Sequence, residues 1–171
     1  MRSKPRRLTR LMATALGLAA MIAAHADGGS QMPRIVPSAY AQECASCHVA
    51  YPPNMLPARS WQRVMSGLDK HYGTDASLDA TTVQQLSTWL QANAGSYKRV
   101  REEPPQDRIT RSAWFERKHR EIDDTVWKLT SVKSAGNCGA CHTGADRGEY
   151  SDNRLQVPAG LDARLRRARN D

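Results

Sequence analysis

The sequence has little of the material from which a protein core is built. It contains a single phenylalanine among 171 residues, and its mean hydropathy is −0.64. Beyond the first 26 residues, no apolar run approaches the length of about 20 residues that a transmembrane helix needs. No segment alternates apolar and polar residues as a strand does, so the pattern favours helices and loops. A chain this polar needs core material from another source, or it stays partly disordered.

The longest apolar segment lies at the N-terminus and has the features of an export signal. Five basic residues precede a mostly apolar stretch of 14 residues, 11–24, and the small-residue pattern Ala-His-Ala ends at Ala26. This order is typical of a secretory signal peptide, and the apolar stretch is too short for a membrane anchor. We therefore predict that residues 1–26 are cleaved. Residues 27–171 would then form a periplasmic protein that does not span the membrane.

Removal of this signal changes the charge balance. The full chain has 25 basic and 17 acidic residues, a formal charge of +8. The signal holds five of the basic residues and none of the acidic ones, so the mature chain has 20 against 17, or +3. We therefore expect no nucleic-acid partner. The basic stretch RLRRARN near the C-terminus is interpreted as a solvated surface.

All four cysteines fall in two copies of one motif, CASCH at 44–48 and CGACH at 138–142. Cys-x-x-Cys-His is the attachment signature of c-type haem. On a helical turn, residues at i and i+3 share a face, so the two thiols can reach the two vinyl groups of one porphyrin. The sequence thus predicts two haem c groups, which also supply the missing core. The predicted attachment residues are Cys44, Cys47, Cys138 and Cys141, with His48 and His142 as proximal iron ligands.

Three other uses of the cysteines explain less of the pattern. Structural disulfides are common in exported proteins, but they leave His48 and His142 without a role. A zinc site of four cysteines usually has its two pairs close in sequence, whereas about ninety residues separate these two. A thioredoxin-like redox pair accounts for one motif, and the alternation of strands and helices expected around it is absent from the sequence pattern.

Two histidines of the mature chain lie outside the motifs, and they match in number the two remaining axial positions. His71 ends a run of apolar residues at helical spacing that begins at Trp61, and Gly73 can stop that helix. We predict His71 as the sixth ligand of the N-terminal haem. A histidine bonded within the core is the alternative, and Met55 and Met65 are rival thioether ligands.

His119 lies in the charged stretch ERKHREI, which by itself suggests a solvated surface. Ser112 is a suitable N-cap, however, and Phe115, His119 and Ile122 follow at the i, i+4 and i+7 spacing of one helical face. No methionine follows Met65 that could serve as a local thioether ligand. We predict His119 as the sixth ligand of the C-terminal haem.

The remaining pattern predicts an all-α protein of two small haem-centred helical lobes with substantial loop content. A further helix should begin at the N-cap Asp79 and run to Ala94, and a short one should lie at 125–130. The polar segment around Pro104-Pro105 is the predicted lobe boundary. It divides the mature chain into an N-terminal lobe, 27–104, and a C-terminal lobe with the basic tail, 105–171.

Several stretches resemble the bacterial dihaem cytochrome c family. They are ECASCHVAYPPNMLPARSWQRVMSGLDKHYG, RKHREI with Trp127 downstream, and NCGACHTGADRGEYS, and the resemblance runs from about Gln42 to Asp152. The resemblance implies two bis-histidine haems, an N-terminal lobe like a class I cytochrome c and a smaller C-terminal helical lobe. It also implies an electron acceptor like sphaeroides haem protein, an oxygen-binding monohaem cytochrome. His48 and His142 match the proximal positions of the family, and His71 and His119 match the distal ones.

Two bis-histidine haems leave no axial position open for oxygen or peroxide, which favours an electron carrier over an enzyme. We expect a periplasmic shuttle between a membrane-side donor, such as a cytochrome b, and a soluble haem protein. The alternatives are a dihaem peroxidase-like enzyme in which one iron opens, and an electron-transfer subunit of a reductase complex. In the second case the tail LDARLRRARND would be an interaction segment.

Overall fold

The computed structural model describes residues 32–96, 100 and 102–161. The predicted signal peptide and most of the basic tail lie outside these residues. These residues include three α-helices, α1 (Ala58–Ser66), α2 (Ala80–Ala92) and α3 (Ala113–Lys118). The described part has three isolated β-bridges but no strand, and none of its helices is long and apolar enough to cross a membrane. The prediction of an all-α fold with many loops is therefore confirmed.

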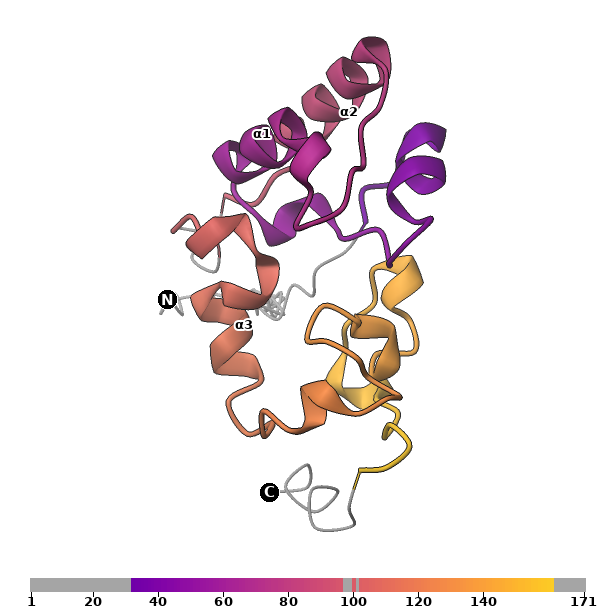
Figure 1. The fold of residues 1–171 in the computed structure, drawn as a ribbon, viewed down its shortest axis with the longest axis vertical. Helices are drawn as coiled ribbons and strands as arrows, with labels where there is room; N and C mark the ends of the chain where they lie inside the picture. Colours follow the sequence, from indigo (N-terminus) through magenta and orange to yellow (C-terminus); the bar gives the residue numbers. More distant parts are fainter. Residues whose placement is uncertain (1–31, 97–99, 101, 162–171) are drawn as a thin grey trace, which may run out of the picture.

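The other helical segments are single turns of π or 3₁₀ type. They are η1 (Tyr40–Cys44), η2 (Pro53–Met55), η3 (Leu68–Lys70), η5 (Pro105–Asp107), η6 (Ile109–Arg111), η7 (Val126–Lys128), η8 (Cys138–Ala140), η9 (Ala145–Arg147) and η10 (Asp152–Arg154). Figure 1 shows α1 and α2 side by side at one end of the molecule and the segments after α3 at the other. The lobe boundary at Pro104-Pro105 stays a prediction.

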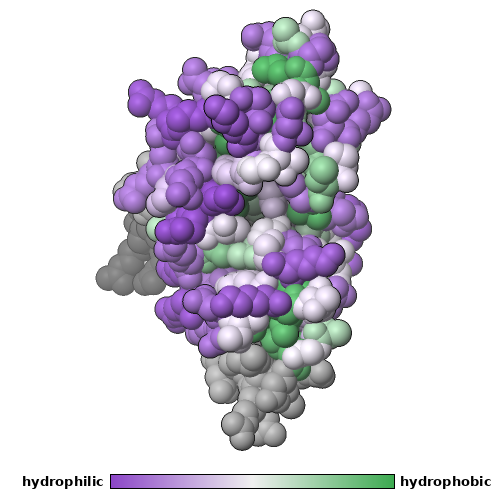
Figure 2. Space-filling model, in the orientation of Figure 1, coloured by the Kyte–Doolittle hydropathy of each residue, from purple (hydrophilic) through white to green (hydrophobic). Residues whose placement is uncertain are grey.

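The largest apolar core lies where α1 and α2 pack together. Its buried members are Tyr40, Leu56, Trp61, Met65, Leu86 and Leu90. The Trp61 indole donates a hydrogen bond to the carbonyl oxygen of Pro53 at 2.6 Å, so its one polar group is satisfied inside the core. Met65, the rival thioether ligand, is an ordinary member of this core. The face of the molecule drawn in Figure 2 is largely hydrophilic, with apolar residues in small separate areas.

The predicted start of α2 is correct. The Asp79 carboxylate accepts hydrogen bonds from the backbone N–H groups of Thr81 and Thr82, both at 3.0 Å. These bonds satisfy two of the four N–H groups that a helix leaves unpaired at its N-terminus. The helix ends at Ala92, two residues before the predicted end.

The helix predicted to carry His71 is wrong in its second half. α1 ends at Ser66, because Gly67 adopts a non-helical conformation with φ −124° and ψ 32°. Glycine has a low helix propensity, and the prediction from apolar spacing did not take into account that Gly67 would end the helix. After one 3₁₀ turn, His71 begins a tight turn in which Tyr72 and Gly73 both have positive φ, 52° and 101°. His71 and Thr74 close this turn as an isolated bridge.

The helix predicted around His119 is correct at its start and wrong at its end. The Ser112 hydroxyl accepts a hydrogen bond from the Phe115 N–H at 3.1 Å, as an N-cap does. α3 ends at Lys118, and His119 is its C-cap. The chain then turns, so Ile122 leaves the predicted apolar face and is 39% exposed. The short helix predicted at 125–130 is the 3₁₀ turn η7, in which Val126 is buried.

Candidate haem-binding site

The structure brings the four predicted iron ligands together in two pairs. The ring centroids of His48 and His71 are 6.2 Å apart, and their planes differ by 17°. The centroids of His119 and His142 are 6.3 Å apart, with planes 77° from each other. Each pair joins a motif histidine to the distal histidine that the sequence assigned to the same lobe.

The two separations suit a metal ion held between the rings. A metal–imidazole bond is about 2 Å long, and a ring centroid lies about 1 Å behind its nitrogen, so two imidazoles on opposite sides of one ion have centroids roughly 6 Å apart. Both observed pairs match this spacing. The chain therefore has room for one iron in each pair.

No disulfide joins any of the four cysteines, so all of them are available for covalent haem attachment. Burial raises the pKa of the Cys44 and Cys138 thiols to about 11 each. A low-pKa thiolate is the mark of a redox-active cysteine pair, so these values disfavour the thioredoxin-like interpretation. Within the described residues, no group of three or more His, Cys, Asp or Glu side chains is placed to hold a metal ion without a porphyrin.

His48 and His119 each use Nδ1 for a hydrogen bond, which leaves Nε2 of each ring free. Nδ1 of His48 lies 2.7 Å from the carbonyl oxygen of Val49, and Nδ1 of His119 lies 2.9 Å from that of Phe115. A carbonyl oxygen only accepts, so Nδ1 carries the proton in both rings and Nε2 keeps its lone pair for a metal. His119 obtains its partner because it caps α3, one turn after Phe115.

The packing around the second pair also favours neutral rings. The His119 ring stacks on Phe115 at 4.0 Å and meets the edge of Trp127 at 6.0 Å. Burial lowers the pKa of His119, and burial followed by the neighbouring His119 lowers that of His142. Nδ1 of His142 is buried and has no hydrogen-bond partner in the described part of the chain. Neutral imidazole is the form that binds metal.

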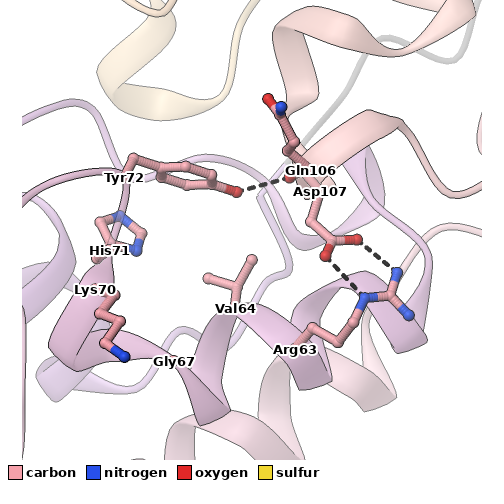
Figure 3. A pocket seen from close by; sticks show the side chains of 8 residues that line it. All are labelled: Arg63, Val64, Gly67, Lys70, His71, Tyr72, Gln106 and Asp107. Atoms are coloured by element: carbon pink, nitrogen blue, oxygen red, sulfur yellow. Dashed lines mark hydrogen bonds and ion pairs between the residues drawn. The ribbon is translucent and has the colours of Figure 1, made fainter.

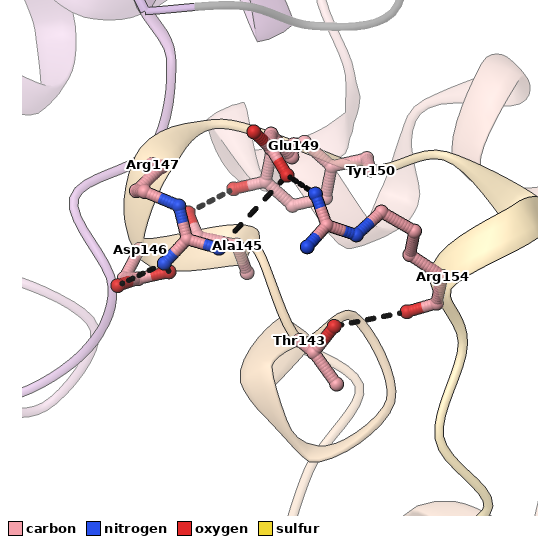
Figure 4. Close-up of polar contacts among 7 residues, drawn as sticks. All are labelled: Thr143, Ala145, Asp146, Arg147, Glu149, Tyr150 and Arg154. Carbon is pink, nitrogen blue, oxygen red and sulfur yellow. Dashed lines mark hydrogen bonds and ion pairs between the residues drawn. The ribbon is translucent and has the colours of Figure 1, made fainter.

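Polar contacts link residues of the segment that follows the second motif (Figure 4). The Thr143 hydroxyl donates to the carbonyl oxygen of Arg154 at 3.1 Å, and the Arg154 guanidinium pairs with Glu149 at 2.7 Å. His142 itself forms an isolated bridge with Leu155. The Tyr150 ring meets the His142 ring edge-on at 5.5 Å. These contacts fold 143–155 back on the motif, and the only helical elements within this segment are the short 3₁₀ turns η9 and η10.

His71 lies beside a polar hollow of about 140 Å³ (Figure 3). Burial and then the neighbouring His48 lower the pKa of His71. On one side of the hollow, Arg63 makes two hydrogen bonds to the Asp107 carboxylate, at 2.6 and 2.8 Å. The Tyr72 hydroxyl donates to the Asp107 carbonyl oxygen at 2.9 Å. The segment that follows Pro104-Pro105 is thereby tied to the turn that carries His71.

Comparison with known families decides between the interpretations of the cysteine motifs. Residues 40–150 match the dihaem cytochrome c family. The chain belongs to the dihaem cytochrome c family. It therefore carries two covalently attached haem c groups, as the motifs predicted. The two histidine pairs and the free thiols are the described residues that fit these groups.

Solved structures of dihaem cytochromes c resemble the chain throughout their own length. A structure from Rhodobacter sphaeroides has 39% sequence identity and a TM-score of 0.59, covering 68% of this chain and 98% of that one. A dihaem cytochrome from Shewanella baltica OS155 has 33% identity and a TM-score of 0.63, covering 72% and 96%. No curated protein sequence matches the chain. The resemblance drawn from the sequence motifs is confirmed.

Proposed function

We propose that this dihaem cytochrome is a periplasmic electron carrier with two bis-histidine haems. His48 and His71 would ligate one iron, and His119 and His142 the other. The observation that carries this proposal is the arrangement of the four histidines in two pairs with centroids 6.2 and 6.3 Å apart. Members of a dihaem cytochrome family transfer electrons, and the chain's residues hold and orient the groups that do so.

The ligand set favours a carrier over an enzyme. With an imidazole on each side of an iron, no axial position is open for oxygen or peroxide. Axial methionine raises the potential of a c-type haem, so two imidazoles should keep both potentials comparatively low. A low-potential carrier suits transfer from a membrane-side donor, such as a b-type cytochrome, to a soluble haem protein like sphaeroides haem protein.

The exposure of the first motif supports transfer to a separate protein. Ala45, Ser46 and Cys47 are exposed and Cys44 is half-buried, whereas all five residues of the second motif, 138–142, are half-buried. The N-terminal attachment site is thus the more accessible of the two to a docking partner. Interfaces between redox partners are small and short-lived, so an exposed edge is sufficient for contact.

Stopped-flow mixing tests the proposed acceptor. Reduced, haem-loaded protein is mixed without oxygen with an oxidised monohaem protein of the sphaeroides haem protein type. An unrelated monohaem cytochrome c of higher potential serves as the control acceptor, since it has the larger driving force. We expect faster second-order transfer to the first acceptor. Transfer no faster than to the control would contradict the proposed partner, while leaving the family assignment intact.

A peroxidase-like enzyme is the second candidate, because His71 occupies a turn beside the 140 Å³ hollow and not a helix. A turn can move its side chain more easily than a helix can. Oxidation of the reduced protein by hydrogen peroxide at a saturating, catalytic rate would favour this candidate. A slow rate proportional to peroxide concentration, and equal in His71→Ala and wild-type protein, would argue against it. A role as a subunit of a reductase complex would rest on the tail, most of which lies outside the described residues.

A further inference from the structure

Tyr51 contacts both haem motifs at once. Its ring stacks on the His48 ring, with centroids 4.9 Å apart and planes 24° from each other. Its hydroxyl donates a 2.6 Å hydrogen bond to the carbonyl oxygen of Gly136, which stands two residues before Cys138. The two bonded residues are 85 positions apart in the chain. A single side chain thus joins the proximal ligand of the first site to the attachment segment of the second.

The two motifs also approach each other at Gly139, inside the second motif. A Cβ atom added to Gly139 would lie 3.8 Å from Cγ1 of Val49, the residue after His48. The residues that flank the two sites therefore lie near each other at a second place, and Tyr51 supplies the directional bond between the segments.

The surroundings of Tyr51 hold it in this position. The hydroxyl of Tyr40, a core residue 2% exposed, donates a hydrogen bond to the Tyr51 carbonyl oxygen. The Gly136 carbonyl oxygen can only accept, so the Tyr51 hydroxyl is the donor in the bond between them. A side chain at position 136 would crowd the Tyr51 hydroxyl, because a Cβ atom added to Gly136 would lie 3.2 Å from the hydroxyl oxygen.

We propose that Tyr51 is the positioning residue that couples the two haem sites: its ring sets the plane of the His48 imidazole, and its hydroxyl sets the spacing between the motifs. Tyr51 is neither oxidised nor reduced in this role. One electron passes from the reduced to the oxidised iron, and Tyr51 fixes the distance and orientation on which that passage depends. The inference rests on the electron-transfer function proposed above, but not on the identity of any partner.

Three variants separate the two parts of this role in the haem-loaded protein. Tyr51→Phe removes the hydroxyl and keeps the ring, and Tyr51→Leu removes both. Gly136→Ala crowds the hydroxyl from the other side without changing Tyr51. Thr88→Val is the control, because it removes an exposed hydroxyl whose 2.9 Å bond to the Gln84 carbonyl oxygen stays within α2, away from both haem motifs.

Two measurements give the expected results. Loss of a hydrogen bond worth about 1 kcal/mol should raise amide hydrogen exchange at 134–139 about fivefold in Tyr51→Phe and Gly136→Ala, and not in Thr88→Val. Electron paramagnetic resonance should show an unchanged signal for the first haem in Tyr51→Phe, since the ring still faces His48. The same signal should shift in Tyr51→Leu. Tyr51→Phe and Tyr51→Leu should also slow electron exchange between the haems, measured after a light pulse has driven the reduction of one of them.

The proposal is overturned if Tyr51→Phe exchanges electrons between the haems at the wild-type rate and shows wild-type amide exchange. It is equally overturned if Thr88→Val produces the same changes. If Tyr51→Leu does not accumulate with haem, the resonance measurement is made on Tyr51→Met in its place. Tyr51→Phe and Gly136→Ala still test the role of the hydroxyl. All readouts are intramolecular, so failure of the proposed acceptor to react would leave them unaffected.

Discussion

The His119 ring stands 77° from the plane of His142, whereas His48 and His71 are nearly parallel, at 17°. The difference arises from local structure. The Phe115 carbonyl oxygen fixes the His119 ring at the end of α3, and Tyr51 stacks on His48 in the other pair. Hydrogen-bond partners of this kind commonly fix the orientation of histidine ligands.

The plane angles predict two different haem environments. The angle between two axial imidazoles affects the splitting of the iron d orbitals, so perpendicular and parallel pairs give different magnetic spectra. Electron paramagnetic resonance of the oxidised protein should show two low-spin signals in equal amounts, the more anisotropic one from the His119–His142 pair. A single signal that accounts for both haems would contradict the observed geometry.

Replacement of His119 by methionine should raise one midpoint potential. A thioether ligand stabilises the reduced iron relative to imidazole, so His119→Met should shift the C-terminal haem upward and leave the other in place. Potentiometric titration followed by absorption measures both values. Met65→Leu is the control, since Met65 lies in the α1–α2 core and should not affect either potential. A shift in Met65→Leu, or none in His119→Met, would contradict the ligand assignment.

Loss of the α3 cap should weaken the protein. Ser112 is 6% exposed and accepts the Phe115 N–H, so Ser112→Ala leaves a buried donor unpaired. We expect a loss of about 1 kcal/mol in the free energy of unfolding, measured by denaturant titration of the haem-loaded protein. The exposed Ser66, whose hydroxyl bonds the Arg63 carbonyl oxygen within α1, gives the control Ser66→Ala. An equal loss in both variants would mean that the cap has no special role.

The Arg63–Asp107 pair predicts a dependence of stability on acid. The Arg63 guanidinium holds the pKa of the Asp107 carboxyl below its ordinary value. A carboxyl with a lowered folded-state pKa contributes stability above its unfolded pKa, and this contribution is lost as the pH falls through the folded value. Unfolding titrations across the acidic range should show wild type and Asp107→Asn converging as the pH falls. Curves that stay parallel would show that the pair does not link stability to pH.

Local sequence signals predicted the parts of the site that depend on near neighbours. The two motifs specify thiols and proximal histidines within five residues, and Asp79 and Ser112 cap helices through bonds to residues two or three positions away. The order of the apolar residues also gave the face that packs α1 on α2. Such features need no knowledge of distant segments.

The parts that were missed depend on distant segments or on a single glycine. Gly67 ended α1 early, so His71 reaches its partner from a turn and not from a helix. Arg63 and Asp107 are 44 residues apart, and no spacing rule connects them. Tyr51 begins the segment YPP that follows the first motif, but the sequence gives no sign of its hydrogen bond to Gly136, 85 residues away. The neighbours of a side chain in the folded protein decide such roles.

Absorption spectroscopy of the purified haem-loaded protein, reduced with and without carbon monoxide, tests the central claim most directly. Two low-spin haems with filled axial positions should give spectra that carbon monoxide does not change. The variants His71→Ala and His119→Ala should each leave one iron with an open axial position, and carbon monoxide should bind there. A high-spin band in the wild-type protein, or a clear spectral shift on adding carbon monoxide, would contradict bis-histidine ligation at one or both sites.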